Sequence, residues 1–74
     1  MKQTFIVYLN DDAGKMVTFE RFACARLDTV KKNMTKLLES SLYRACIKPA
    51  TSYSVYRTPD GYHKEATPAF TATI

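Results

Sequence analysis

The sequence predicts a two-layer α+β fold of ββαββ order, in which one amphipathic helix packs on one face of a mainly antiparallel sheet. Three observations predict it: two extended runs at the start, a helical stripe in the middle, and a tyrosine-rich extended run with a strong turn after it. The 74 residues are expected to form one small domain over 1–74. A chain of this size buries only about 60% of its unfolded surface, so its core is thin.

The first half begins with a predicted hairpin. Residues 4–9 are β-branched and aromatic, as in a strand, and residues 10–14 (NDDAG) suit a turn. A second run from Lys15 to about Ala23 alternates apolar and polar side chains, with Val17 and Phe19 on one side. Residues 19–26 also keep helical spacing, which leaves strand or helix open there, but residues 16–19 are weak helix formers and favour a strand.

The helix is the clearest of the predicted elements. Asp28 or Thr29 can cap its start, and Pro49 stops it after Lys48. A helix of about 20 residues would be about 30 Å long. Apolar and small residues recur at spacings of three and four and form one stripe: Leu27, Val30, Met34, Leu37, Leu38, Ser41 and Ala45.

Two more strands are expected after the helix. Residues 51–57 are rich in Tyr and Ser, and residues 58–61 (TPDG) are a strong turn signal. Residues 62–66 would then return as the fourth strand of a hairpin. Residues 69–74 alternate apolar residues with Thr, so residues 67–74 are either an extra edge strand or an extended arm.

Composition excludes several classes of function. No stretch approaches the 18 or so apolar residues of a membrane span, which predicts a cytoplasmic protein with no membrane partner. The isolated Cys24 and Cys46 are expected to be small buried side chains. One histidine and no paired cysteines predict no metal site, and two glycines are too few for a phosphate loop, so no cofactor is expected.

A catalytic site is not predicted either. A nucleophile needs a neighbouring base, and His63 follows a turn, where a surface position is expected. Asp11 and Asp12 are adjacent in a turn and lack the ligand spacing of a calcium loop. We therefore expect a non-enzymatic binding module.

Charge distribution suggests a site for nucleic acid. The net charge is +4, and residues 26–50 carry all of it, because the charges on either side cancel. We expect an electrostatic, sequence-independent nucleic-acid interface on a basic helix face. The competing interpretation is a solvated face with internal pairs such as Asp28–Lys32 and Lys36–Glu39. The predicted nucleic-acid-binding residues are Arg26, Lys31, Lys32, Lys36, Arg44 and Lys48.

The alternative function uses the other face of the sheet, because one helix covers only one face. Phe5, Val7 and Leu9 are expected inward, and Ile6 and Tyr8 outward. Tyr53 or Tyr56, with Arg57 or Lys64, would lie on the uncovered face; such aromatic and basic mixtures resemble platforms that stack single-stranded bases. They equally suit a protein-interaction or inhibitor domain, of the kind found among accessory proteins of phages and mobile elements. The residues of this alternative protein interface are Tyr8, Tyr53, Tyr56 and Tyr62.

A second copy of the chain is one further partner to consider. Association with a second copy would add buried surface to a thin core, so a homodimer is a further candidate assembly. A measurement of the oligomeric state would test it.

Overall fold

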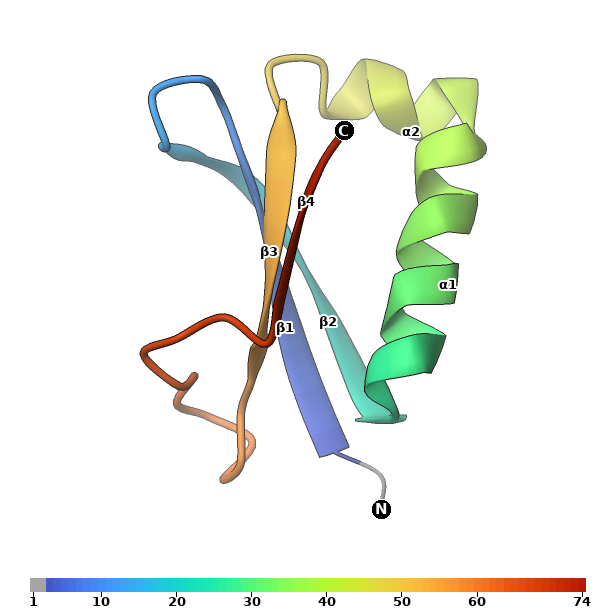
Figure 1. The fold of residues 1–74 in the computed structure, drawn as a ribbon. Helices are drawn as coiled ribbons and strands as arrows, with labels where there is room; N and C mark the ends of the chain where they lie inside the picture. Colours follow the sequence, from blue (N-terminus) through green and yellow to red (C-terminus); the bar gives the residue numbers. More distant parts are fainter. Residues whose placement is uncertain (1–2) are drawn as a thin grey trace.

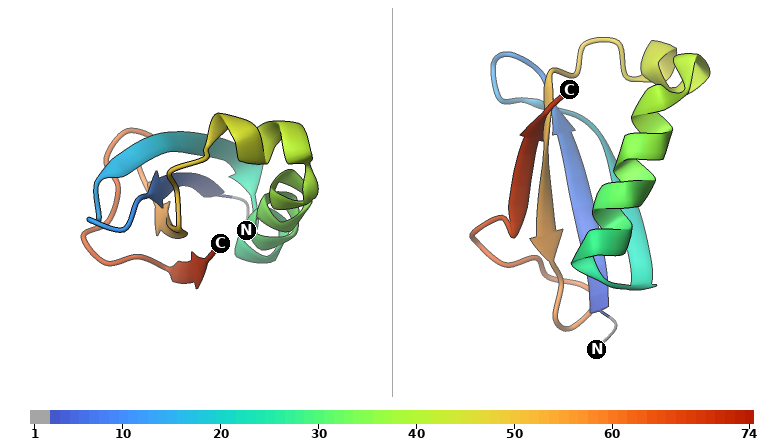
Figure 2. Two further views of the ribbon diagram at one scale, coloured as in Figure 1. Left: turned by 90° about the horizontal axis from the view of Figure 1, so that it is seen from above. Right: turned by 45° about the vertical axis from the view of Figure 1, so that its right-hand side comes forward.

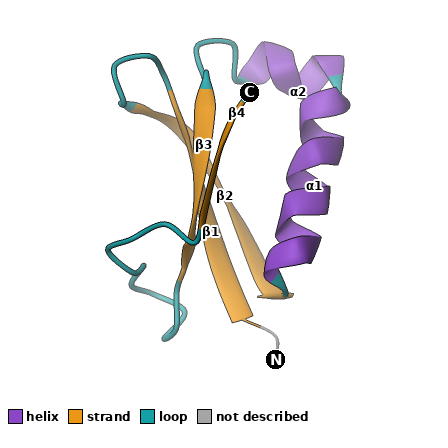
Figure 3. Cartoon of the chain, in the orientation of Figure 1, coloured by secondary structure: helices purple, strands orange, loops and turns teal. Residues whose placement is uncertain are grey.

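A computed structural model describes residues 3–74 of the chain and shows an α+β fold with a four-stranded sheet. The sheet order is β2-β1-β3-β4, and every neighbouring pair is antiparallel. Both helices lie on one side of the sheet (Figures 1 and 3). The α+β class and the antiparallel sheet are therefore confirmed. The elements are β1 (Gln3–Asn10), β2 (Met16–Ala25), α1 (Leu27–Glu39), α2 (Ser41–Cys46), β3 (Ser52–Arg57) and β4 (Phe70–Thr73).

The hairpin of β1 and β2 forms around Asp11. Its Oδ1 accepts hydrogen bonds from the N–H groups of Ala13 (3.0 Å) and Lys15 (2.9 Å). Gly14 closes the turn at φ 79°, a left-handed conformation that glycine adopts without steric cost. The strand interpretation of residues 19–26 is confirmed as far as Ala25, where β2 ends.

The core lies between the sheet and α1. On β1, Phe5, Val7 and Leu9 are buried while the residues between them are half-buried, so the predicted alternation is confirmed. Helix α1 contributes Val30 and Met34 to the same core. We call this face of the sheet the inner face; it also holds Tyr53 and Val55 of β3. Ile47 and Ala50, from the segment between α2 and β3, complete the set of buried hydrophobic residues.

The prediction of a single helix of about 20 residues is wrong, because the helical segment breaks at Ser40. Ser40 has extended backbone angles (φ −78°, ψ 119°), and its Oγ accepts the N–H of Tyr43 at 3.3 Å. A serine at this position gives the next turn an N-cap, so a new helix starts in a new direction. The predicted caps of α1 are also wrong, since the N-cap is Arg26, without a side-chain hydrogen bond, and Asp28 lies inside the first turn.

The fourth strand predicted at residues 62–66 is also wrong. The Oδ1 of Asp60 accepts the N–H groups of Tyr62 (2.8 Å) and His63 (2.7 Å). Side-chain capping of this kind competes with strand pairing, because it takes donors that a ladder needs. Residues 58–69 therefore form a loop, which we call the 58–69 loop, on the side of the sheet away from the helices (Figures 1 and 2).

Strand β4 takes the place next to β3 instead. Beyond the ladder itself, the N–H of Ala69 bonds to the carbonyl of Val55 (2.7 Å), and the N–H of Ile74 bonds to that of Thr51 (2.9 Å). Of the two alternatives for residues 67–74, the edge strand is the one observed, at the opposite edge from β2 (Figure 2). Phe70, Ala72 and Ile74 pack against the core.

Candidate binding surfaces

The helical layer, defined as residues 26–50, holds all six basic residues predicted to bind nucleic acid. Lys32 and Lys36 lie one turn apart on α1, and both are exposed. Arg26, Arg44 and Lys48 are exposed as well, whereas Lys31 is half-buried. In the part of the chain that the structure describes, neither Asp28–Lys32 nor Lys36–Glu39 forms an ion pair.

Two of these cations also hold the fold together. The Nζ of Lys31 lies 4.3 Å from the ring centroid of Phe70, a cation–π contact between α1 and β4. The Nη1 of Arg44 lies 3.4 Å from the carbonyl oxygen of Leu38 and donates a long hydrogen bond across the helix break. The helical layer therefore presents Lys32 and Lys36 as its most direct candidates for contact with an anionic partner.

The open face of the sheet is the face opposite the helices. Cross-strand partners share a face, so Ile6 lies beside Arg21 and Tyr56, and Tyr8 lies beside Phe19 and Ser54. The alternation also places Thr71 and Thr73 of β4 on this face.

Two tyrosines and a lysine form a cluster on the open face. The rings of Tyr8 and Tyr56 are tilted by 58° with centroids 5.6 Å apart. The Nζ of Lys64, from the 58–69 loop, lies 4.3 Å from the Tyr56 centroid and 5.9 Å from that of Tyr8. Of the alternatives offered by the sequence, Tyr56 and Lys64 are therefore the pair found on the open face.

Tyr53 does not belong to this surface. It pairs with Leu9 on the inner face, is only 5% exposed and packs on the ring of Phe70 with centroids 6.1 Å apart. Its burial raises the pKa of its hydroxyl. Tyr62, in the 58–69 loop, is 86% exposed. The predicted set of four tyrosines is thus divided, because alternation along β3 turns Tyr53 and Tyr56 to opposite faces.

Phe19 and Arg21 lie on the open face, although the sequence did not predict them there. Phe19 is 52% exposed and lies directly opposite Tyr8. It was expected on the same side as Val17, but the register shifts near this end of the hairpin, where Leu9 pairs with Thr18 and Asn10 with Met16. Val17 still packs against the core while Phe19 points outward. The alternation of apolar and polar residues in the sequence does not reveal a bulge of this kind.

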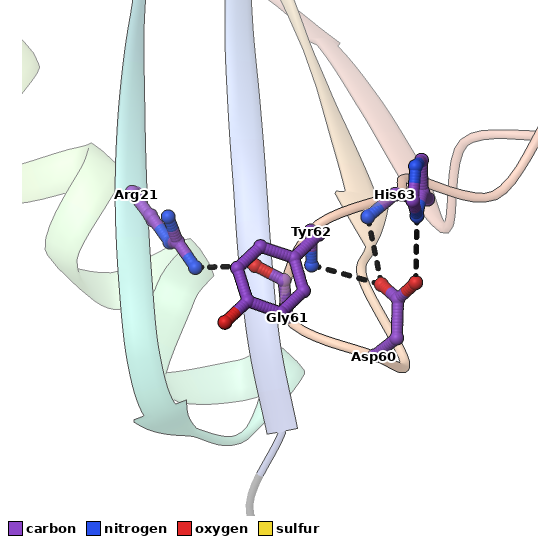
Figure 4. Close-up of polar contacts among 5 residues, drawn as sticks. All are labelled: Arg21, Asp60, Gly61, Tyr62 and His63. Atoms are coloured by element: carbon purple, nitrogen blue, oxygen red, sulfur yellow. Dashed lines mark hydrogen bonds and ion pairs between the residues drawn. The ribbon is translucent and has the colours of Figure 1, made fainter.

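The 58–69 loop is held in place by polar contacts (Figure 4). The Oδ2 of Asp60 lies 2.7 Å from the Nδ1 of His63, and the Arg21 guanidinium donates to the carbonyl of Gly61. The hydrogen bonds from the backbone and ring of His63, with that from the backbone of Tyr62, lower the pKa of Asp60 below its usual range. Arg21 therefore ties the loop that carries Lys64 to strand β2.

Tyr43 of α2 is half-buried and packs against the core. Because the helix breaks at Ser40, α2 starts with a new helical phase. The hydroxyl of Tyr43 donates a hydrogen bond to the Glu20 carboxylate at 3.1 Å. Burial, followed by the negative charge of Glu20, raises the pKa of Tyr43 to about 12. Glu20 is the only acidic residue within the four strands, and it is turned to the inner face.

Cys46 is exposed, contrary to the expectation of a buried thiol, and the side chain of Cys24 lies outside the described part of the structure. Within residues 3–74, no group of three His, Cys, Asp or Glu side chains could hold a metal ion.

Comparisons with known proteins leave the two surfaces as the basis for inferring function. No protein-family model, curated protein or solved structure matches the chain. Neither helix of the described chain is long and apolar enough to cross a membrane.

Proposed function

We propose that the protein is a non-catalytic module that binds nucleic acid electrostatically through its helical layer. The observation that carries this proposal is the separation of charge between the layers. Residues 26–50 hold six basic and two acidic residues, so their net charge equals the +4 of the whole chain. A protein whose excess charge lies on one side presents that side to a polyanion.

The exposed residues of the layer suit contact with phosphates. Lys32 and Lys36 are one helical turn apart, about 5–6 Å, on the solvent side of α1. Lysine binds phosphate as a point charge and needs no fixed geometry, which fits binding without sequence preference. Binding of this kind releases counterions and therefore weakens steeply as salt rises.

The test reverses charge on the helix. Lys32→Glu combined with Lys36→Glu is expected to abolish binding of a labelled DNA duplex at low salt, measured by fluorescence anisotropy. The single variant Lys32→Glu should lower the slope of log K against log salt by about 1. Circular dichroism should stay unchanged, because both side chains are exposed.

A matched control changes the net charge equally elsewhere. Lys15 is exposed in the turn between β1 and β2, outside the helical layer. Lys15→Glu should leave most of the duplex affinity intact. If Lys15→Glu and Lys32→Glu weaken binding equally, net charge alone governs binding and the helical layer is not the site. If Lys32→Glu combined with Lys36→Glu binds the duplex as tightly as the wild type, the proposal is overturned.

A further inference from the structure

We propose that the open face of the sheet binds the unpaired bases of single-stranded nucleic acid. Phe19 and Tyr8 stack on bases, and Arg21 and Lys64 contact the phosphates. This inference rests on the proposed function for the class of ligand, and it adds a second surface with a preference for single strands.

The aromatic residues form a row across three adjacent strands. Phe19 on β2 is the direct cross-strand partner of Tyr8 on β1, and Tyr8 lies 5.6 Å from Tyr56 on β3, centroid to centroid. Neighbouring strands bring such side chains to a spacing of about 5 Å. Bases of a single strand have π-faces free for stacking, whereas the bases of a duplex are already stacked on each other.

Phe19 gives the row an accessible ring. It is 52% exposed on a face that the helices do not cover. Lys64 lies over Tyr56 and, at a greater distance, over Tyr8, so the Phe19 end of the row is the more open. A base can therefore stack on Phe19 without rearrangement of the core.

Charge complementarity favours phosphate as the second part of the ligand. The open face carries the cations Arg21 and Lys64 close to the rings. Glu20, the only carboxylate of the four strands, is on the inner face and accepts a hydrogen bond from Tyr43. The strand positions of the open face thus contain no negative charge in the described chain, and the hydroxyls of Ser54, Thr71 and Thr73 lie on the same face. The 58–69 loop does carry two carboxylates, Asp60 and Glu65, and that of Asp60 accepts the N–H groups of Tyr62 and His63.

A second copy of the chain is a poorer occupant of this face. A twofold dimer buries the same surface on both subunits. A dimer centred on the aromatic row would bring the cations of both copies, Arg21 and Lys64, into one interface, where the loop carboxylates of Asp60 and Glu65 would have to offset them. Like charges at an interface are unfavourable. Phosphate neutralises these cations, and a base covers the rings.

The experiment compares ligands and variants at one low salt concentration. Fluorescence anisotropy measures binding of oligothymidylate and of a duplex of the same length. Phe19→Leu keeps apolar volume but removes the ring, and it should weaken oligothymidylate binding about fivefold or more. Phe19→Tyr keeps a ring and should bind like the wild type. Lys64→Gln, at an exposed position, should also weaken single-strand binding.

Each outcome decides the proposal. Selective loss of oligothymidylate binding in Phe19→Leu and Lys64→Gln, with duplex binding retained, supports it. Equal affinity of Phe19→Leu and wild type for oligothymidylate overturns it, as does an equal loss in Phe19→Leu and Phe19→Tyr. A wild-type dimer that Phe19→Leu converts to a monomer, measured by sedimentation, would make a second copy the occupant instead.

The failure of this inference can be told from the failure of the proposed function. If Lys32→Glu with Lys36→Glu loses the duplex but keeps oligothymidylate, both surfaces act as proposed. If the wild type binds the duplex but not oligothymidylate, only the open-face proposal fails. If the wild type binds neither ligand, both proposals fail.

Discussion

Tyr53 and Tyr56 are three residues apart on one strand and have opposite environments. Tyr53 is on the inner face, buried between Leu9 and Phe70, where it belongs to the core. Tyr56 is on the open face, beside Tyr8 and beneath the ammonium of Lys64. The same side chain therefore stabilises the fold in one position and forms a polar, cation-lined surface in the other.

The two faces of the sheet differ in the same way over their whole area. The inner face is covered by helices and holds the buried hydrophobic residues, together with Glu20, the only strand carboxylate. The open face holds Phe19, Tyr8 and Arg21, none of which is fully buried. Substitutions on the open face should therefore cost little stability, whereas substitutions on the inner face should act on stability first.

The largest effect is expected for Leu9→Ala. Leu9 is 0% exposed, and truncation of a buried leucine to alanine costs about 2–5 kcal/mol. Ile6→Ala, on the same strand but half-buried on the open face, should cost clearly less. Urea denaturation of both variants measures the difference. Equal losses would mean that the 58–69 loop makes the open face a second core.

A somewhat smaller effect is expected when residues 70–74 are deleted. Phe70, Ala72 and Ile74 pack against the core but are only half-buried, so their loss should cost about 2–4 kcal/mol. Thr71→Ala, on the open face of the same strand, should cost less than about 0.5 kcal/mol. Thermal denaturation of both proteins tests this. A deletion variant that melts like the wild type would show that β4 contributes nothing to the core.

The sequence predicted those parts of the fold that depend on local chemistry. Alternation in residues 4–9 predicted which side chains of β1 are buried, and the Asp11 turn predicted the hairpin. The predictions from the sequence were wrong where one side chain redirects the backbone. Ser40 interrupts a stripe that is continuous in sequence, and Asp60 captures the N–H groups that a fourth strand at 62–66 would have needed. Either outcome is compatible with the same apolar pattern.

The candidate surfaces were predictable to different extents. The basic layer depends only on composition along the chain; five of its six cations are exposed, and Lys31 is half-buried against Phe70. The open face depends on register, which one bulge changes. The bulge therefore hid Phe19, and the choice between Tyr53 and Tyr56 required the pairing of β3 with β1.

The smallest effect concerns the contact that holds Glu20 on the inner face. Tyr43→Phe removes the hydroxyl that donates to Glu20 at 3.1 Å, and should cost about 0.5–1.5 kcal/mol. Glu20→Gln keeps an acceptor for that hydroxyl and serves as the control. Urea denaturation at neutral pH measures both. A Tyr43→Phe variant as stable as the wild type would mean that the hydrogen bond adds nothing beyond its exchange with water.

The pH dependence of the same contact gives an independent measure. The pKa of Tyr43 is about 12 in the fold against 10.0 for an unperturbed tyrosine. Between these values the folded protein keeps a proton that the unfolded chain releases, so the free energy of unfolding falls as pH rises from about 10 to about 12. Tyr43→Phe should show a shallower fall over this range, and the phenolate absorbance of the wild type should include a late-titrating step that the variant lacks. If the two proteins lose stability in parallel, the fall comes from other groups, and Glu20 is held on the inner face by the strand register alone.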